Sequence, residues 1–425
     1  MNAVFTIAAK NYLAQARTLG DSIKRIHPAL PFHVILLDEV EGALDLAREP
    51  YPTIEATQLG ITAHRDMAFK YDLVEFATAI KPFVFRYLFD RYDYEKLIYF
   101  DPDIFVYSTL DLILEALDEH FLILTPHVTK LELSNRGVIS EETLLFVGAY
   151  NLGFVAFNRS ERSQSLIEWW KTRLENKGYA DRFDALHVDQ KWMDLIPGFF
   201  DSGVWIARHP GLNASHWNMH ERVLGHEAGA YTMDGSPLVF FHFSGFDPKT
   251  PHLITGPQKQ SLATLQDKPE YAKLFRTYAE DIQRNRTASA DLPYSYAQFA
   301  NGVRIFAFQR RLYRKLSEAG YRYEDPFATV PGSFYDTLRE NKLLIADRDA
   351  AGEYRQTSIS RAGLKLRLLK RALLLLKKII GIKYYHLWLR TMAVLSRPEE
   401  QTFLLETLRL DQPVRFGMIP GTRSD

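Results

Sequence analysis

The chain has 425 residues with 52 basic and 52 acidic side chains, so its formal net charge is zero and gives no sign of nucleic-acid binding. It contains no cysteine, which excludes disulfides, thiolate metal ligands and a cysteine nucleophile and fits a reducing cytoplasm. The length predicts one large domain plus an accessory region. We see neither a signal peptide nor an apolar run of about 18 residues, so we expect a soluble or peripherally attached protein.

The N-terminal part alternates between strand-like and helix-like patterns. An apolar run at 4–9 is followed by apolar residues from Leu13 to Ile26 at the spacing of one helix face, and a second apolar run covers 32–37. Strands that alternate with helices predict an α/β fold with a mainly parallel sheet. No Gly-x-Gly-x-x-Gly follows either run, so the usual dinucleotide fingerprint is missing.

Further along the chain, the patterns predict helices at 67–78, 82–91 and 165–174, and strands at 121–125, 144–147, 154–157 and 238–246. Beyond about residue 251 the sheet pattern stops and the chain is typical of helices joined by loops. We therefore expect an α/β domain over residues 1–250 and a mainly helical C-terminal region over 251–425.

The most informative strand covers Lys96 to Phe100 and ends in Asp101-Pro102-Asp103. Pro102 cannot donate to a ladder, so the strand stops there and leaves both carboxylates at the carboxyl edge, where open α/β sheets bind ligands. Two like charges this close favour a cation between them. The alternative is an acidic turn that only solvates the strand end.

A third potential ligand, His242, lies near the end of the strand at 238–246. Two carboxylates and an imidazole suit Mn²⁺ or a similar divalent ion such as Mg²⁺ better than Ca²⁺, and such an ion would neutralise a diphosphate. A lone histidine beside a core strand is more often a structural group, so a functional role for His242 depends on which residues lie at the other strand ends.

These motifs resemble the GT-A glycosyltransferases, and among them the family 8 type that includes glycogenin and bacterial lipopolysaccharide glycosyltransferases. The resemblance covers roughly residues 1–250 and is most specific in 97–103, which is similar to the family's apolar strand and metal-binding Asp-x-Asp. It implies a twisted sheet flanked by helices, with Asp101, Asp103 and His242 as the metal ligands and Asp101 also close to the donor.

The resemblance also implies contacts to the nucleotide. The segment from Thr6 to Tyr12, which includes Ala8, is similar to the family's first strand and nucleobase loop, which implies that Tyr12 stacks on uracil. Arg86 sits where the family has an arginine that reaches the donor, and Lys81 is a weaker neighbour. For both cations the alternative is a solvated helix face.

Two further pairs are similar to the family's sugar-binding motifs. Asn151 and Gly153 resemble its Asn-x-Gly beside the transferred sugar, and Asp189 with Gln190 resembles its Asp-Gln pair near the reacting carbon. An Asp-Gln pair could also simply cap a helix.

The diphosphate contact departs from the family pattern. The segment from His242 to Gly245 is similar to the start of its His-x-x-Gly-x-x-Lys, but Pro248 stands at the lysine position and Lys249 follows one residue later. Lys249 could replace the missing lysine, or a cation from Lys81 or Arg86 could do so.

Taken together, the residues predict a metal-dependent glycosyltransferase that moves a sugar to a hydroxyl of a glycan or glycolipid, with a UDP-sugar as the favoured donor. The resemblance implies retention of anomeric configuration, with Asp189 and Gln190 as the catalytic pair. Residues 213–218, with His216 and Trp217, are candidates for contacts to the acceptor or donor sugar. The alternatives are a sugar-1-phosphate nucleotidyltransferase and a non-catalytic nucleotide-sugar or glycan-binding protein.

The C-terminal region contains a basic segment at 361–398. It has ten lysines and arginines and no acidic residue, so the rest of the chain carries an acidic excess of ten. Leucines interleave with the cations, and aromatic residues follow at 384–388. This composition is typical of a helix on an anionic membrane surface, which would place the protein in the cytoplasm at the inner face of the membrane. A helix packed on its own domain with a solvated basic face is the alternative.

Overall fold

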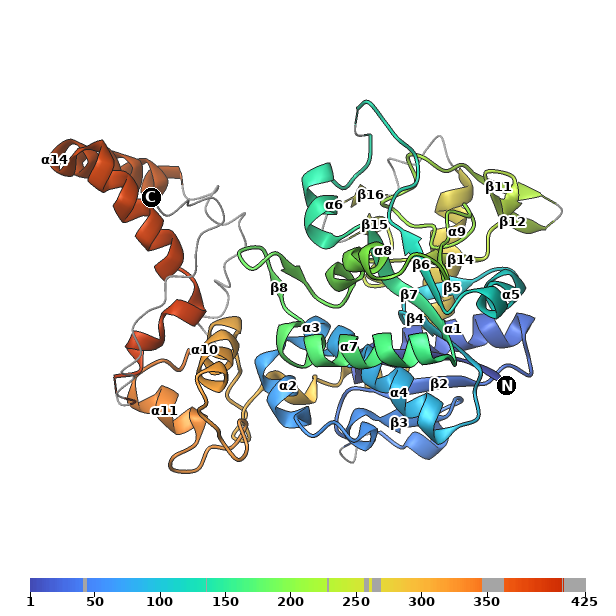
Figure 1. Ribbon diagram of the computed structural model, residues 1–425, viewed down its shortest axis with the longest axis horizontal. Helices are drawn as coiled ribbons and strands as arrows, with labels where there is room; N and C mark the ends of the chain where they lie inside the picture. Colours follow the sequence, from blue (N-terminus) through green and yellow to red (C-terminus); the bar gives the residue numbers. More distant parts are fainter. Residues whose placement is uncertain are drawn as a thin grey trace. The chain divides into compact units, whose positions relative to one another are not determined.

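The computed structural model describes residues 1–40, 44–134, 136–227, 229–255, 260–261, 269–345, 363–406 and 408 (Figure 1). They form two compact units. The first consists of Met1–Met67 with Leu73–Ser295, and the second of Ala68–Asp72 with the described residues from Tyr296 onward. The first unit runs past the boundary expected at residue 250, because Phe275 and Tyr278 of α9 (Pro269–Arg284) pack against Phe243.

The centre of the first unit is a seven-stranded sheet in the order β10-β6-β7-β4-β1-β2-β3. β1 pairs in parallel with β2 and β4, β2 with β3, and β10 with β6, whereas β7 runs antiparallel to both β4 and β6. The expected mainly parallel α/β sheet is therefore confirmed. The strands are β1 (Asn2–Ala8), β2 (Phe32–Leu36), β3 (Thr53–Glu55), β4 (Lys96–Phe100), β6 (Leu122–Pro126), β7 (Tyr150–Asn158) and β10 (Val204–Ile206).

Helices cover both faces of this sheet (Figure 1). On one face, α1 (Leu13–Ile26) and α5 (Asp111–Glu119) pack their apolar stripes on alternate strand residues such as Val4, Ile98 and Ala156. On the other face, Phe85 of α4 (Lys81–Arg91) contacts the rings of Phe5 and Phe157, and α4 packs on α7 (Glu161–Lys177). The period-two alternation of the strands thus buries both faces, as a sheet of this type requires.

Three predicted elements differ from the structure. The strand expected at 238–246 is limited to β14 (Phe240–His242). The strand expected at 144–147 is wrong, since these residues end helix α6 (Glu141–Val147), which Ser140 caps by accepting the N–H of Thr143. A four-residue apolar run does not distinguish a strand from one helix turn, whereas the capping serine and the acidic first turn favour the helix. The helix expected at 67–78 is interrupted, forming α2 (His64–Lys70) and α3 (Leu73–Ala79).

Shorter elements complete the first unit. β5 (Ile104–Val106) pairs antiparallel with β14 (Phe240–His242) beside the main sheet. The others are β8 (Ala180–Asp181), β9 (Leu186–His187), α8 (Ile196–Phe199), β11 (Leu224–Glu227), β12 (Ala230–Met233), β13 (Ser236–Pro237), β15 (Leu253–Thr255) and β16 (Gln260–Ser261).

The second unit is helical in its described part. Its elements are α10 (Ala307–Glu318), α11 (Phe334–Glu340) and the long α14 (Gly363–Leu395). Phe69 packs at its centre against the rings of Tyr313, Phe327 and Phe334, and buried Arg310 donates to the carbonyls of Ala68, Phe69 and Tyr71. Among the described residues, no helix combines the length and apolar character needed to cross a membrane.

Candidate active site

The sheet register brings the predicted metal ligands together. Asp101, Pro102 and Asp103 connect β4 to β5, and the pairing of β5 with β14 sets His242 opposite Ile104. The N–H of Phe243 donates to the carbonyl of Asp103 at 2.9 Å, and the N–H of Asp101 donates to the carbonyl of Gly153 in β7 at 2.7 Å. Backbone bonds from two neighbouring strands therefore fix the position of the acidic turn.

The three side chains converge on one point. His242 Nε2 lies 3.1 Å from Asp103 Oδ1 and 3.8 Å from Asp101 Oδ2, and one potential ligand atom from each residue lies within 4.8 Å of the others. The imidazole is 3% exposed, whereas the two carboxylates are 28% and 20% exposed and face solvent. Burial lowers the pKa of His242, but the nearby carboxylates outweigh it and raise this pKa overall. Such a cluster of negative charge favours a cation.

Asn151 and Gly153 support the histidine. The Nδ1 atom of His242 lies 3.2 Å from Asn151 Oδ1, so a proton on Nδ1 leaves Nε2 free to act as a ligand. A Cβ on Gly153 would lie 2.3 Å from Cε1 of His242, closer than a methyl group can approach. Asn151 therefore orients the His242 imidazole, and the absence of a side chain at Gly153 leaves space for it.

Lys81 and Asp189 form a buried ion pair beside this cluster. Their side chains are each 1% exposed, and Lys81 Nζ lies 2.8 Å from Asp189 Oδ2 and 3.7 Å from Asp101 Oδ1. The same ammonium donates to the carbonyl of Leu152 at 2.7 Å. Burial raises the pKa of Asp189 to about 6, although Lys81 opposes the shift.

The backbone before Asp189 is strained. Val188 has a φ of 42°, a left-handed conformation that costs a β-branched residue about 1–3 kcal/mol. Gln190 begins the 3₁₀ turn after it, and its side chain donates to the carbonyl of Val147 at 2.8 Å. Strain held in this way at a buried carboxylate is typical of a functional position.

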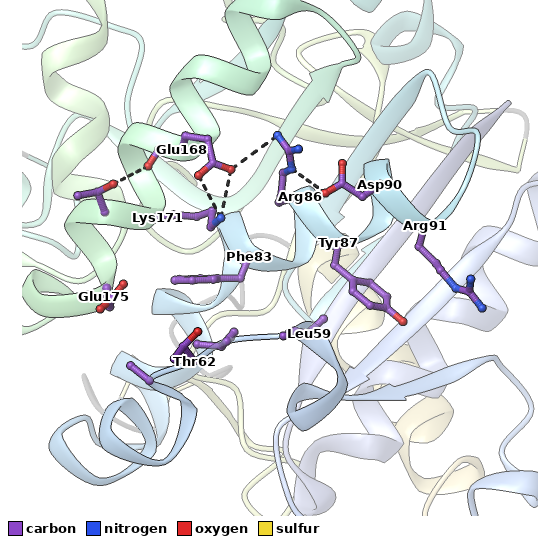
Figure 2. Close-up of a pocket in the computed structure, with 14 residues that line it drawn as sticks. Leu59, Thr62, Phe83, Arg86, Tyr87, Asp90, Arg91, Glu168, Lys171 and Glu175 are labelled. Carbon is purple, nitrogen blue, oxygen red and sulfur yellow. Dashed lines mark hydrogen bonds and ion pairs between the residues drawn. The ribbon is translucent and has the colours of Figure 1, made fainter.

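Arg86 does not join the site. It bonds to Asp90 at 2.7 Å and to Gln164 at 3.0 Å, and it lines a separate cleft of about 540 Å³ between α4 and α7, with Lys171 and Glu168 (Figure 2). Residues five apart on a helix point about 140° away from each other, so α4 cannot turn Lys81 and Arg86 toward one ligand. Lys81 is therefore the residue at the acidic cluster, and a contact between Arg86 and the donor stays a prediction.

Tyr12 and Lys249 line a second cavity of about 250 Å³. Burial, Asp103 and Asp247 raise the pKa of Tyr12 to about 12, so its hydroxyl stays protonated. Ala8 ends β1 and is buried, with its carbonyl accepting from Leu37. Gly245 takes a φ of 73° in the turn after β14 that leads to Lys249.

Three other residues line this cavity, of which only Asn11 belongs to the segment from Thr6 to Tyr12 that the sequence had indicated. Among the described residues, Asn11 Oδ1 and Gln15 Oε1 are buried without a hydrogen-bond partner, and Arg286 adds a second cation to the lining. Gln15 belongs to the helix after β1, a position that could have suggested it. Arg286 follows α9, and nothing in its sequence neighbourhood pointed to it.

Residues 213–218 lie next to Asn151 and His242. Asn213, with a φ of 50°, donates to Asn151 Oδ1 at 3.1 Å, and the Trp217 ring lies 5.2 Å from that of His242. Within the described chain, His216 Nε2 and Trp217 Nε1 are buried and unpartnered, as is Nδ1 of His127, a residue that the sequence had not indicated. Burial lowers the pKa of both His127 and His216 to about 4. These imidazoles are therefore neutral at pH 7.

Comparison with known sequences gives distant relatives. No known protein-family profile matches the chain. It is 26% identical over 255 residues to the uncharacterized protein YfnF of Bacillus subtilis (strain 168), a match that covers 58% of this chain and 82% of the relative. It is 28% identical over 175 residues to the uncharacterized protein YfnD of the same strain, which covers 40% of this chain and 54% of that protein.

Among solved structures, the chain is similar to the galactosyltransferase LgtC in complex with donor and acceptor sugar analogs, at 16% identity and a TM-score of 0.40 over 66% of this chain and 95% of that one. Mouse xyloside xylosyltransferase 1 gives 13% identity and a TM-score of 0.38, over 57% and 98%. The apo form of GlyE from Streptococcus pneumoniae TIGR4 gives 14% and 0.38, over 80% and 82%. Because these TM-scores are low, the function of the chain must be inferred from the residues of its own site.

Proposed function

We propose that the protein is a metal-dependent glycosyltransferase that moves a sugar from a nucleotide-sugar, with UDP as the favoured nucleotide, to a hydroxyl of a glycan or glycolipid. The observation that carries the proposal is the convergence of Asp101, Asp103 and His242 at the strand ends, beside the buried Lys81–Asp189 pair. Clusters of this kind at the carboxyl edge of an α/β sheet are typical of ligand sites.

The potential metal ligands fit Mn²⁺, with Mg²⁺ as the alternative. Two carboxylates and an imidazole are ligands that Mn²⁺ accepts, and the His242–Asn151 contact is the kind of support that orients a metal-binding histidine. When bound, the ion would neutralise the charge that develops on the departing diphosphate. Asp101, Asp103 and His242 would hold it.

The reaction exchanges one bond to the anomeric carbon for another. The bond to the diphosphate oxygen breaks, the acceptor oxygen bonds to the carbon, and the departing diphosphate takes up the proton of the acceptor hydroxyl. Asp189, a carboxylate at neutral pH, would stabilise positive charge on the sugar ring, and Gln190 lies next to it. Lys81 is a positioning residue, because Asp189 and the Leu152 carbonyl already engage its ammonium. We propose retention of configuration on the resemblance of the Asp-Gln pair alone.

The cavity around Tyr12 is the proposed site of the nucleotide. Tyr12 offers a ring for stacking, and the side-chain oxygens of Asn11 and Gln15, which have no partner among the described residues, could accept hydrogen bonds from the edge of a base. Lys249 and Arg286 supply positive charge to the same cavity, so either could replace the lysine that is missing at Pro248.

The region around His127, His216 and Trp217 is the proposed acceptor site. His127 lines a cleft of about 420 Å³ with the apolar side chains of Leu144 and Leu145. His127 Nδ1, His216 Nε2 and the indole N–H of Trp217, which are buried and without partners in the described chain, would bond to sugar hydroxyls, and an apolar face of the sugar would pack on the indole ring. Such a site would select neutral hydroxyl-rich acceptors.

Turnover of a donor panel tests the proposal. The full chain is incubated with UDP-, GDP- and dTDP-sugars, with and without Mn²⁺, and release of free sugar and nucleotide is measured. We expect metal-dependent hydrolysis of one donor and a rise in melting temperature with that donor. Asp103→Asn should lower the rate by at least about 100-fold at an unchanged melting temperature. Asp90→Asn, an exposed carboxylate in the other cleft, is the matched control and should keep full activity. Full metal-dependent turnover by Asp103→Asn would refute the assignment.

The same panel separates the alternatives. A non-catalytic nucleotide-sugar-binding protein would be stabilised by a donor yet release no sugar from it, with or without acceptor glycans. A nucleotidyltransferase would produce nucleotide-sugar from sugar 1-phosphate and nucleoside triphosphate. It would ordinarily carry a glycine-rich phosphate loop after the first strand, where this chain has the 3₁₀ turn Lys10–Tyr12.

A further inference from the structure

Helix α14 of the second unit consists of two amphipathic arms. The backbone leaves helical geometry at Gly381, whose φ of 79° and ψ of 163° are accessible in practice only to glycine. The first arm covers residues 363–380 and the second 382–395, about 27 Å and 21 Å long at 1.5 Å per residue. Arg361, the first cation of the basic segment, lies outside the described residues.

Among the described side chains of the first arm, the cations share one face with Leu374, and the other apolar residues occupy the rest of the surface. Its described cations recur at spacings of 3, 4, 7 and 8 residues, which place them on one side of a helix. Apolar residues fill most of the remaining surface at similar spacings. The cations are Arg367, Lys370, Arg371, Lys377 and Lys378, and the apolar face includes Leu368, Leu369, Leu375, Leu376 and Ile379.

The second arm repeats the arrangement with aromatic residues. Lys383, His386 and Arg390 share one side, and Tyr384, Trp388 and Leu395 lie on the other. If the two arms formed one uninterrupted helix, turning 100° per residue, the centres of the apolar faces named here would lie about 140° apart. A break is therefore needed before both faces can meet one flat surface, and Gly381 provides it.

The apolar face of α14 is not covered by the described part of the chain. No side chain described between residues 366 and 395 is buried, and the exposed fractions reach 60% at Leu375, 72% at Ile379 and 66% at Ile382. A soluble domain does not normally leave such a long apolar face exposed, so the face indicates an interaction site.

The charge of α14 distinguishes between the partners that could cover its apolar face. Two copies of this helix would repel each other, because the segment 361–398 contains no acidic residue to pair with its cations. A nucleic acid would satisfy the cations but leave the leucines in water. An anionic bilayer satisfies both faces, because leucine side chains enter the acyl region, lysines and arginines reach the headgroups, and Tyr and Trp favour the boundary between them.

We propose that α14 is a docking surface for an anionic lipid bilayer, on which it lies without crossing it. This inference does not depend on the proposed glycosyltransferase activity. If the glycosyltransferase activity and the bilayer docking are both correct, the first unit would be tethered to a membrane, where lipid-linked acceptors are found.

Sedimentation with vesicles tests the docking. The full chain is mixed with vesicles of phosphatidylcholine alone or with phosphatidylglycerol, and the bound fraction is measured at low and high salt. We expect binding only to the anionic vesicles, weakened by salt. Lys377→Gln/Lys378→Gln should bind roughly 30-fold more weakly, since each cation at an anionic surface contributes about fivefold. Lys273→Gln/Arg276→Gln, two exposed cations of α9, is the control with the same net charge and should bind as wild type.

A second measurement tests the orientation of the helix. Brominated lipids should quench the fluorescence of wild-type protein more than that of Trp388→Phe, because Trp388 would lie at the acyl boundary. Equal binding to neutral and anionic vesicles, absence of binding to both, or equal loss of binding in the two double variants would overturn the proposal. So would a concentration-dependent dimer that the α14 substitutions dissociate, or retention by RNA without retention by vesicles.

Discussion

The strand-end site and helix α14 carry charge in opposite ways. At the strand ends, Lys81 and Asp189 are each 1% exposed and His242 is 3% exposed, and their partners come from distant parts of the chain. In α14, the cations follow one another along a single helix and lie at the surface. Buried charge is retained only where a specific partner compensates its desolvation, whereas exposed charge needs only water.

Because of this difference, we expect substitutions in the two regions to affect different properties of the protein. A change to a fully buried group at the strand ends should alter folding stability and chemistry together, because the same contacts serve both. A change in α14 should leave stability nearly unaffected and act on binding alone. Four measurements test this contrast, and their expected effects decrease from the buried ion pair to the exposed helix.

Removal of the buried ammonium should have the largest effect on stability. Lys81→Met leaves Asp189 buried without a partner, so we expect a loss of about 3–5 kcal/mol in the free energy of unfolding, measured with urea. Adding Asp189→Leu should recover most of that loss. Arg86→Met, on the exposed side of the same helix, should cost about 1 kcal/mol or less and leave donor hydrolysis intact. Equal losses from Lys81→Met and Arg86→Met would contradict the contrast.

Acid should destabilise the first unit through its buried imidazoles. The pKa of His127 is about 4 in the folded protein and about 6.5 when unfolded, so the unfolded chain takes up the proton first. Stability is thus lost as pH falls from about 6.5 to about 4, by up to roughly 3 kcal/mol for this residue. Urea unfolding at several pH values should show a shallower loss for His127→Gln. A parallel pH profile for the variant would disprove the assignment.

A methyl group at Gly153 should disturb the candidate metal site and lower the free energy of unfolding by about 1–3 kcal/mol, because it would overlap the buried His242 ring. Gly153→Ala would press on the His242 ring, so we expect Mn²⁺ to bind about 10- to 100-fold more weakly, measured by titration calorimetry. Gly198→Ala, where the new Cβ meets no atom within 4 Å, is the control and should bind as wild type. Unchanged Mn²⁺ affinity in Gly153→Ala would remove His242 from the ligand set.

The smallest effect is expected at the break in α14. Alanine cannot adopt the conformation of Gly381 without strain, so Gly381→Ala should join the two arms into one helix and turn their apolar faces apart. We expect up to about tenfold weaker binding to anionic vesicles, because one apolar face then stays in water. Helical content by circular dichroism should stay equal or rise slightly, and thermal stability should not change. Wild-type vesicle binding would show that the break is dispensable.

Much of the sheet could be predicted from the sequence, because buried strands are local signals. The runs at 4–9, 32–37 and 96–100 each became a strand of the central sheet, and α1 follows the apolar spacing from Leu13 to Ile26. The run at 144–147 failed, since four apolar residues fit one helix turn as well as a strand. The boundary at 250 missed α9, whose attachment to Phe243 is a tertiary contact.

The candidate site shows the same division. Asp101, Asp103, His242, Asn151 and Asp189 stood in a recognisable order, and the structure brings them together. The sequence did not show that Lys81 lies at the acidic cluster while Arg86 lines another cleft, because sequence proximity does not tell which side of α4 a residue occupies. His127 and Arg286 had no local signal, since their importance comes only from the side chains that they meet.

By itself the sequence determined where strands and amphipathic helices form and which residue types can hold a cation or meet a membrane. These properties depend on spacing along the chain, and α14 with its segregated cations is the clearest case. Only the tertiary structure decided which groups share a site, because the pairing of β5 with β14 and of β4 with β7 joins segments that are remote in sequence. Burial then fixed their chemistry, by raising the pKa of Asp189 and keeping His127 neutral.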